Sequence, residues 1–238
     1  SYLVAVSLGD YVDWSTGECS FNSPSFIKLL EFIKTFPEEF DYQVYQEDGY
    51  VDENLLLAQG EILLSTYYAY DLDSFLMQNT LLNGALVFKG FPSENRNGHV
   101  LSANTSLSLS SKSQHKDAAW SFIRTLLTED YQAERMHWGL PTNKTAFDAM
   151  IERSMEASYD EEGNEISKGG WGFADGTEVN IYAATQADVD RFMELINAAG
   201  ITYSYDQNLL NIIQEDAAPF FAGQKSAADA AAAIQSRS

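Results

Sequence analysis

Apolar and polar residues alternate with the spacing of a helix between residues 23 and 37. The apolar side chains of this stretch share one helical face, and they are Phe26, Ile27, Leu30, Ile33 and Phe36. A face of this kind predicts a helix that packs on an apolar surface. Ser23 can cap its first turn, Pro24 suits the first helical position, and Pro37 ends it.

Similar patterns predict further helices in the middle of the chain. Short helices are expected around Asp52 to Ala58 and over residues 71–82. A longer helix is expected over residues 114–128, with Ser113 as its cap. The inward face of this longer helix comprises Ala118, Phe122, Ile123 and Leu126.

Three helices close the chain, and capping residues mark their starts. These residues are Thr185 with Asp188, then Asp206, and finally Ser226 with Asp229. The first of the three helices should stop at Gly200. The inward face of the second includes Leu210, Ile213 and Ala217.

Strand-like segments are fewer than helices and scattered along the chain. The sequence pattern predicts strands at residues 1–11, 61–70 and 98–113, and a further apolar run lies at residues 85–92. Residues 159–176 are polar and rich in glycine, which predicts a hairpin or a long loop. Because strands and helices mix throughout, the predicted fold class is α/β.

The net charge of the chain limits the kinds of molecule that it is expected to bind. The chain carries 35 acidic and 14 basic residues, a formal net charge of -21. Such a field repels nucleic acid and anionic membrane surfaces, which makes both poor partners. The charge indicates either a neutral or cationic ligand or a surface that is simply kept soluble, and solubility is the safer interpretation. No apolar run reaches membrane-spanning length, no signal peptide is visible, and the single Cys19 excludes an internal disulfide framework.

No motif for catalysis, metal binding or cofactor binding stands out. The chain lacks a phosphate-binding glycine loop, a nucleophile elbow and a zinc-binding motif. Its three histidines (His99, His115 and His137) are far apart in sequence. The acidic residues around Asp160 favour a solvated turn over a calcium loop, because the spacing of a calcium loop is not kept.

Aromatic residues are the better candidates for a binding site. Aromatic faces stack on sugar rings, and a tyrosine hydroxyl can form a hydrogen bond with a sugar hydroxyl at the same time. Loops at strand ends are common ligand sites in α/β folds. The candidate ligand-binding residues near such loops are Tyr11, Trp14, Tyr67, Tyr68, Tyr70, Trp171 and Tyr205.

Several stretches, taken together, resemble the family 1 extracellular solute-binding proteins, the bacterial substrate receptors of ABC importers. The stretch most similar to the family is "SLSLSSKSQHKDAAWSFIRTLLTEDYQAERMHWGLPTNK". The closing "FFAGQKSAADAAAAIQSRS" looks like the family's terminal helix pair. "VDWSTGECSFNSPSFIKLLEF" and "AQGEILLSTYYAY" also fall where the family has similar sequences.

The resemblance implies a two-lobed, type II periplasmic-binding-protein-like fold that closes on its ligand. Residues 1–90 would form the first part of the C-terminal lobe. Residues 91–140 would cross to the N-terminal lobe and the hinge, and residues 141–238 would return to the C-terminal lobe. Most of the N-terminal lobe would be absent from this chain, and the closing helices would pack on the C-terminal lobe near the hinge.

The resemblance also implies a function without catalysis or a cofactor. Tyr68 and Tyr70 fall where sugar-binding members place cleft aromatics, and Tyr11 falls near another such position. Leu210 and Asn211 stand where the closing helices of the family usually offer one more aromatic residue. The expected protein captures a sugar or oligosaccharide for the permease subunits of an importer. It would be extracellular, as a cell-surface lipoprotein or a periplasmic protein.

Two other readings stay open at this point. The first is a secreted carbohydrate-active enzyme that uses two carboxylates. The second keeps the binding function but changes the ligand to a peptide, a polyamine or another cationic solute, which the acidic charge would attract. A strong dependence of affinity on salt would favour a cationic ligand over a neutral sugar.

Overall fold

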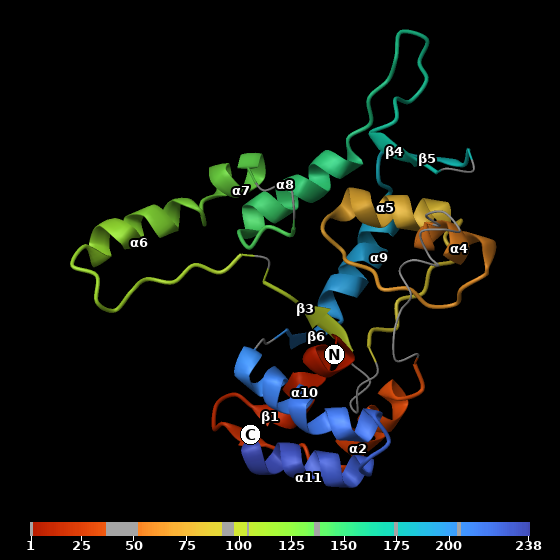
Figure 1. The fold of residues 1–238 in the computed structure, drawn as a ribbon. Helices are drawn as coiled ribbons and strands as arrows, with labels where there is room; N and C mark the ends of the chain where they lie inside the picture. Colours follow the sequence, from red (N-terminus) through yellow and green to blue (C-terminus); the bar gives the residue numbers. More distant parts are fainter. Residues whose placement is uncertain are drawn as a thin grey trace. The chain divides into compact units, whose positions relative to one another are not determined.

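Figure 1 shows the computed structural model of the chain. It describes residues 2–36, 52–91, 98–103, 105–135, 139–173, 176–203 and 206–238. Helices account for about half of these residues, and the strands form small two-stranded sheets, which confirms a mixed α/β protein. The chain divides into two compact units, one from residues 1–49, 89–103 and 197–238, the other from residues 50–88 and 104–196.

The first unit combines the two ends of the described chain with a short middle segment. Its elements are α1 (Tyr2–Tyr11), β1 (Val12–Asp13), β2 (Glu18–Cys19), α2 (Pro24–Ile33), β3 (His99–Leu101), β6 (Ala199–Thr202), α10 (Gln207–Phe221) and α11 (Ala227–Arg237). α11 packs on α2 and on α10 in this unit (Figure 1). Within the described residues, the last helix of the chain therefore contacts an N-terminal helix, and the predicted packing on a C-terminal lobe near a hinge stays a prediction.

The first residues form a helix, so the predicted strand is wrong. Val4, Val6 and Leu8 alternate as in a strand, but Ala5 and Ser7 between them are buried as well. A segment that is buried on both sides has no polar face, and its apolar residues fit a core helix as well as a strand. The sequence pattern alone could not separate the two.

The start of α2 is as predicted. The Ser23 hydroxyl oxygen accepts a hydrogen bond from the Phe26 backbone N–H at 3.4 Å, and Pro24 is the first helical residue. Phe26 and Leu30 are fully buried and face the core of the first unit.

The end of α2 differs from the prediction. The helix ends at Ile33, three residues before Phe36, which therefore leaves the buried face. Phe36 is 52% exposed, and its ring lies edge-on to the exposed Phe32 at a centroid distance of 5.2 Å. Pro37, the predicted end of the helix, lies outside the described residues.

The caps of α10 and α11 are confirmed. The Asp206 carboxylate accepts from the Leu209 N–H at 2.9 Å, and the Ser226 hydroxyl accepts from the Asp229 N–H at 3.1 Å. The buried core of the first unit joins α1, α2, α10 and α11, and its fully buried side chains are Leu8, Phe21, Phe26, Leu30, Ala230, Ala231 and Ile234. Ile213 and Ala217 of the predicted inward face belong to this core, and Leu210 packs at its edge.

The parallel pair of β3 and β6 joins segments far apart in sequence. His99 pairs with Ala199, and Leu101 pairs with Thr202. The strand predicted over residues 98–113 is thus confirmed for His99–Leu101 alone within the described residues. The helix predicted to stop at Gly200 ends at Asn197 instead, because Gly200 belongs to β6.

The second unit is built around α5 and α9. Its elements are α4 (Glu53–Gln59), α5 (Leu72–Leu81), α6 (Lys116–Thr125), α7 (Glu129–Arg135), α8 (Lys144–Met155), β4 (Gly169–Gly172), β5 (Glu178–Ile181) and α9 (Gln186–Asn197). Its buried core comprises Leu72, Phe75, Leu76, Ile181, Ala184, Val189 and Phe192. The Arg191 guanidinium ties α9 to this unit by donating to the Asn79 side chain and to the Leu86 carbonyl.

Most local predictions in this unit are confirmed. Asp52 caps α4, and residues 71–82 contain α5. Thr185 and Asp188 form reciprocal hydrogen bonds at the start of α9, as a capping box requires. Residues 159–176 hold a bridge between Tyr159 and Glu165 and the strand β4, which pairs with β5.

Residues 61–70 are extended without forming a strand, so that prediction is wrong. Leu63 and Leu64 are 89% and 85% exposed. A strand exists through hydrogen bonds to a neighbouring strand, and residues 61–70 have no such neighbour within the described chain.

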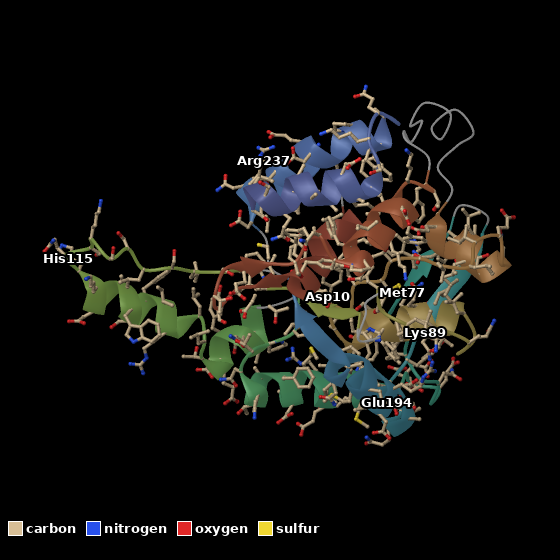
Figure 2. The ribbon with its side chains drawn as sticks, turned by 90° about the horizontal axis from the view of Figure 1, so that it is seen from below. Asp10, Met77, Lys89, His115, Glu194 and Arg237 are labelled. Carbon is tan, nitrogen blue, oxygen red and sulfur yellow. The ribbon has the colours of Figure 1, made fainter. Side chains whose placement is uncertain are left out.

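The helix predicted over residues 114–128 forms as α6, but its surroundings differ from the prediction. The Ser113 hydroxyl accepts from the His115 N–H and does not cap the helix. His115, labelled in Figure 2, directly precedes α6. None of the residues of α6 is buried, and Phe122 of the predicted inward face is 66% exposed. The predicted inward face is therefore not buried: Phe122 is exposed, and Ile123 and Leu126 are only partly buried.

Candidate functional site

The β1–β2 hairpin of the first unit places two of the candidate aromatic residues together. Val12 pairs with Cys19 and Asp13 with Glu18, so a four-residue loop joins the strands. The loop closes through hydrogen bonds from the Thr16 and Gly17 N–H groups to the Asp13 carbonyl, at 3.2 and 2.7 Å. Gly17 has φ +76°, a conformation that glycine adopts without strain.

A pocket of about 540 Å³ lies against this hairpin. Its lining comprises Gly9, Asp10, Tyr11, Val12, Asp13, Trp14, Glu18, Cys19 and Ser20. The structure thus brings Tyr11 and Trp14, both predicted ligand residues, to the lining of one pocket. Trp14 is 46% exposed and offers an accessible indole face.

Tyr11 is held in place by the core beneath the pocket. Its ring packs edge-on against Phe26 at a centroid distance of 5.0 Å and tilts against Phe21 at 6.2 Å. The residue is 8% exposed, so most of its ring area serves the core. Trp14 is therefore the larger accessible aromatic surface of this pocket.

Carboxylates surround the two aromatic residues. Asp10 lies in the last turn of α1 (Figure 2), and Asp13 and Glu18 are cross-strand neighbours in the β1–β2 hairpin. Hydrogen bonds from the Ser15 hydroxyl and N–H hold the pKa of Asp13 below its ordinary value of 3.8. Among the described lining residues none is basic, so the pocket presents hydrogen-bond acceptors with negative charge.

The sequence reasoning missed these three carboxylates as site residues. A signal was present, because Ser15, Thr16 and Gly17 form a turn signature between short segments that can pair. Read as a hairpin, this signature would have placed Asp13 opposite Glu18.

The second unit holds the other aromatic cluster. The rings of Tyr68 and Tyr70 stack with centroids 6.0 Å apart and an interplanar angle of 18°. They are 51% and 45% exposed. Residues two apart in an extended segment point to the same side, which explains why this pair forms.

Tyr67 points to the opposite side and into the protein. Its ring tilts against Phe88 at a centroid distance of 5.5 Å. Its hydroxyl is buried without a regular hydrogen bond to any described residue, although the Ser74 hydroxyl lies nearby. Burial, together with the negative charge of Asp71, raises the pKa of Tyr67 to about 12, and Ser74 opposes this shift.

The last two predicted residues lie apart from these clusters in sequence. Trp171 stands on β4 opposite Val179, and it is 56% exposed on a hairpin in the second unit. Tyr205 lies outside the described residues. The structure therefore groups Tyr11 with Trp14 in one unit, and Tyr68 with Tyr70 in the other.

The described residues contain no group of three or more histidine, cysteine or acidic side chains that could hold a metal ion. Asp160 sits in a turn, where its carboxylate accepts from the Glu162 and Asn164 N–H groups. These bonds and one from the Asn164 side chain lower the pKa of Asp160. Within the described part of the chain, no helix has both the length and the apolar character needed to cross a membrane.

Comparison with known proteins adds no constraint on function. No family model matches the chain, and no curated protein matches it in sequence. The class that the fold and site define is a mixed α/β protein with two accessible aromatic surfaces, one of them set in an acidic pocket.

Proposed function

We propose that the chain belongs to the substrate-binding component of an ABC importer and captures a sugar or oligosaccharide between two lobes. The proposal rests on the resemblance to family 1 solute-binding proteins and includes their type II two-lobed fold. The protein would act outside the cell, as a lipoprotein or in the periplasm, and would deliver its ligand to permease subunits. It would have no catalytic activity.

The stacked pair of Tyr68 and Tyr70 is the observation that carries the proposal. Both rings leave about half of their surface accessible and lie nearly parallel. An exposed apolar surface costs free energy in water, and a sugar ring would cover it while its hydroxyls stay hydrogen-bonded. These are also the residues that the resemblance implies for the cleft.

The hairpin pocket supports the same ligand class with different chemistry. Trp14 offers a flat apolar face, and the neighbouring carboxylates of Asp13 and Glu18 can accept hydrogen bonds from sugar hydroxyls. A flat aromatic ring next to charged acceptors suits a ligand with one apolar face and a rim of hydroxyl groups. Carbohydrates have this character.

The test is a titration of the chain with mono- and oligosaccharides, followed by calorimetry on alanine variants. Tyr70→Ala has a matched control in Tyr182→Ala, because the two side chains are 45% and 46% exposed. Trp14→Ala has its control in Trp120→Ala, at 46% and 51%. Loss of one stacked ring should weaken binding about tenfold, equivalent to about 1.4 kcal/mol, whereas the controls should bind as the wild type does.

Two results would contradict the proposal. One is that Tyr70→Ala and Trp14→Ala bind an identified ligand as tightly as the wild-type chain does. The other is turnover of a bound oligosaccharide, which would favour the carbohydrate-active enzyme instead.

A cationic solute is a second candidate, because the hairpin pocket itself favours it. Three of its described lining residues are acidic and none is basic, in a chain of net charge -21. A polyamine or a basic peptide would gain both ion pairing and a cation–π contact with Trp14. Its affinity should fall steeply between low and physiological salt, whereas the affinity for a neutral sugar should change little.

We also propose that α6 contacts the N-terminal lobe of the two-lobed fold. Trp120 and Phe122 on this helix are 51% and 66% exposed, which supports a partner surface there. Amide hydrogen exchange of the monomeric chain should be fast over residues 116–125, because no side chain of α6 is buried. Slow exchange throughout this helix would contradict the proposal.

A further inference from the structure

A side chain near the end of the chain holds the hairpin that lines the pocket. The Gln235 side-chain Nε2 donates to the Cys19 carbonyl at 2.9 Å. Its Oε1 accepts from the Asn22 N–H at 3.3 Å. The amide therefore satisfies an acceptor on the exit strand β2 and a donor in the turn that follows it.

The helix that carries Gln235 is firmly packed. The neighbouring Ile234 is fully buried in the core of the first unit, as is Ala231 one turn earlier. The side chain thus extends from a fixed support. It reaches Cys19 across 216 positions of sequence.

Other hydrogen bonds described for the hairpin join residues that are close to one another in sequence. Ser20 donates from its N–H to the Tyr11 carbonyl at 2.8 Å, which fixes the start of the segment after β2. The side-chain hydrogen bonds of Asp13, Ser15 and Thr16 stay within the loop. Gln235 supplies hydrogen bonds to this segment from a separate helix.

We propose that Gln235 is a positioning residue, which holds the β1–β2 hairpin in the geometry that brings its pocket to a ligand. This inference rests on the proposed function, because it assumes that the pocket binds solute. Cys19 and Ser20 line the pocket on the strand that Gln235 holds, and Glu18 precedes them. Movement of this strand would separate Glu18 from Asp13 and alter the site around Trp14.

The reactivity of the single cysteine reports the anchoring without any ligand. Cys19 is half-buried and its carbonyl accepts the hydrogen bond from Gln235, so release of the strand should expose its thiol. The experiment measures the rate of thiol labelling in wild type, Gln235→Met and Gln235→Glu. Methionine keeps the length and apolar stem of glutamine but removes both hydrogen bonds, and glutamate keeps the acceptor for Asn22 alone.

We expect labelling of Gln235→Met to be roughly fivefold faster than wild type, the equivalent of about one net hydrogen bond. Gln235→Glu should fall between the two. Gln214→Met is the matched control, because Gln214 is an exposed glutamine on the neighbouring α10, and it should label at the wild-type rate. Thermal unfolding of all variants separates local release from global loss of stability.

Ligand titration then tests the link to binding. Faster labelling in Gln235→Met with weaker binding of the same sugar that Trp14→Ala loses would support the inference. A wild-type labelling rate in Gln235→Met would overturn it. A third outcome is that Gln235→Met labels faster but binds the sugar as tightly as wild type, while Trp14→Ala binds it more weakly. This outcome would also overturn the positioning role of Gln235. Unchanged affinity in both variants would instead refute the pocket as a ligand site and leave the anchoring supported.

Discussion

Tyr67 is the predicted ligand residue whose role the structure makes easiest to test. Its hydroxyl is buried against Phe88 and Asp71 without a regular hydrogen bond to any described residue. A buried polar group without a partner costs roughly 1–3 kcal/mol. Tyr67→Phe removes this group and keeps the ring, so the variant should be as stable as wild type at pH 7 or more stable by about 1 kcal/mol.

The pH dependence of the free energy of unfolding gives a second, independent test of the burial of this hydroxyl. The pKa of Tyr67 is about 12 in the folded protein against an ordinary 10.0. Because the pKa of Tyr67 is higher in the folded state than in the unfolded state, ionisation of this hydroxyl lowers the free energy of unfolding. The stability is unaffected by this ionisation below pH 10 and is lost progressively as the pH rises through 12. This linkage costs wild type about 1.4 kcal/mol at pH 11 and approaches about 2.7 kcal/mol above pH 12.

Urea unfolding of both proteins at pH 7 and pH 11 measures the two effects together. The stability of wild type relative to Tyr67→Phe should fall by about 1.4 kcal/mol between these pH values. Ultraviolet absorbance should show that Tyr67→Phe removes a tyrosine that titrates near pH 12. A stability difference that is the same at both pH values would refute the burial of the hydroxyl. A loss of sugar affinity in Tyr67→Phe would place that hydroxyl in the site.

Three further predictions concern hydrogen bonds of Asp13, Lys34 and Gln132. Because the pKa of Asp13 is lowered, its stabilising effect is present above about pH 4 and lost in stronger acid, so wild type and Asp13→Asn should converge in urea unfolding at about pH 2. Lys34 donates to the Phe220 carbonyl at 2.7 Å and lies 4.5 Å from the ring centroid. Lys34→Met should therefore lose about 1–2 kcal/mol in urea unfolding, and Lys28→Met, an exposed change on α2, which Lys34 directly follows, should lose little. Gln132 on α7 is 3% exposed and bonds to the Leu126 carbonyl before α7 and to Thr142 and Asn143 just before α8. Gln132→Met should therefore cost about 2–3 kcal/mol, and a smaller loss would contradict its buried role.

Local signals predicted several helices of this fold, but not α1, which was expected as a strand, and not α7 or α8. Ser23, Asp206 and Ser226 each cap the helix that the sequence analysis assigned to them. Such a cap is decided by residues two or three positions away, so its whole physical cause is visible in a short stretch of sequence. Ser113 is the exception, because its hydroxyl bonds to His115 ahead of the helix.

Strands and packing partners could not be predicted in the same way. The apolar runs at residues 1–11 and 61–70 look alike in sequence, yet one contains a buried helix and the other is extended and exposed. The difference depends on what lies beside each segment, which is a non-local property. Equally, Tyr67 and Tyr68 are adjacent and identical in type, but only the fold decides that one faces Phe88 and the other faces water.

The construction of the first unit from distant segments has a consequence for folding order. α2 leaves the ribosome long before α11, the helix whose Ala230, Ala231 and Ile234 complete the same core. Contacts across such a separation in sequence close slowly, since loop closure must precede the contact energy. The core of the first unit therefore stays incomplete until α10 and α11 have been synthesised, whereas every element of the second unit precedes them in the chain.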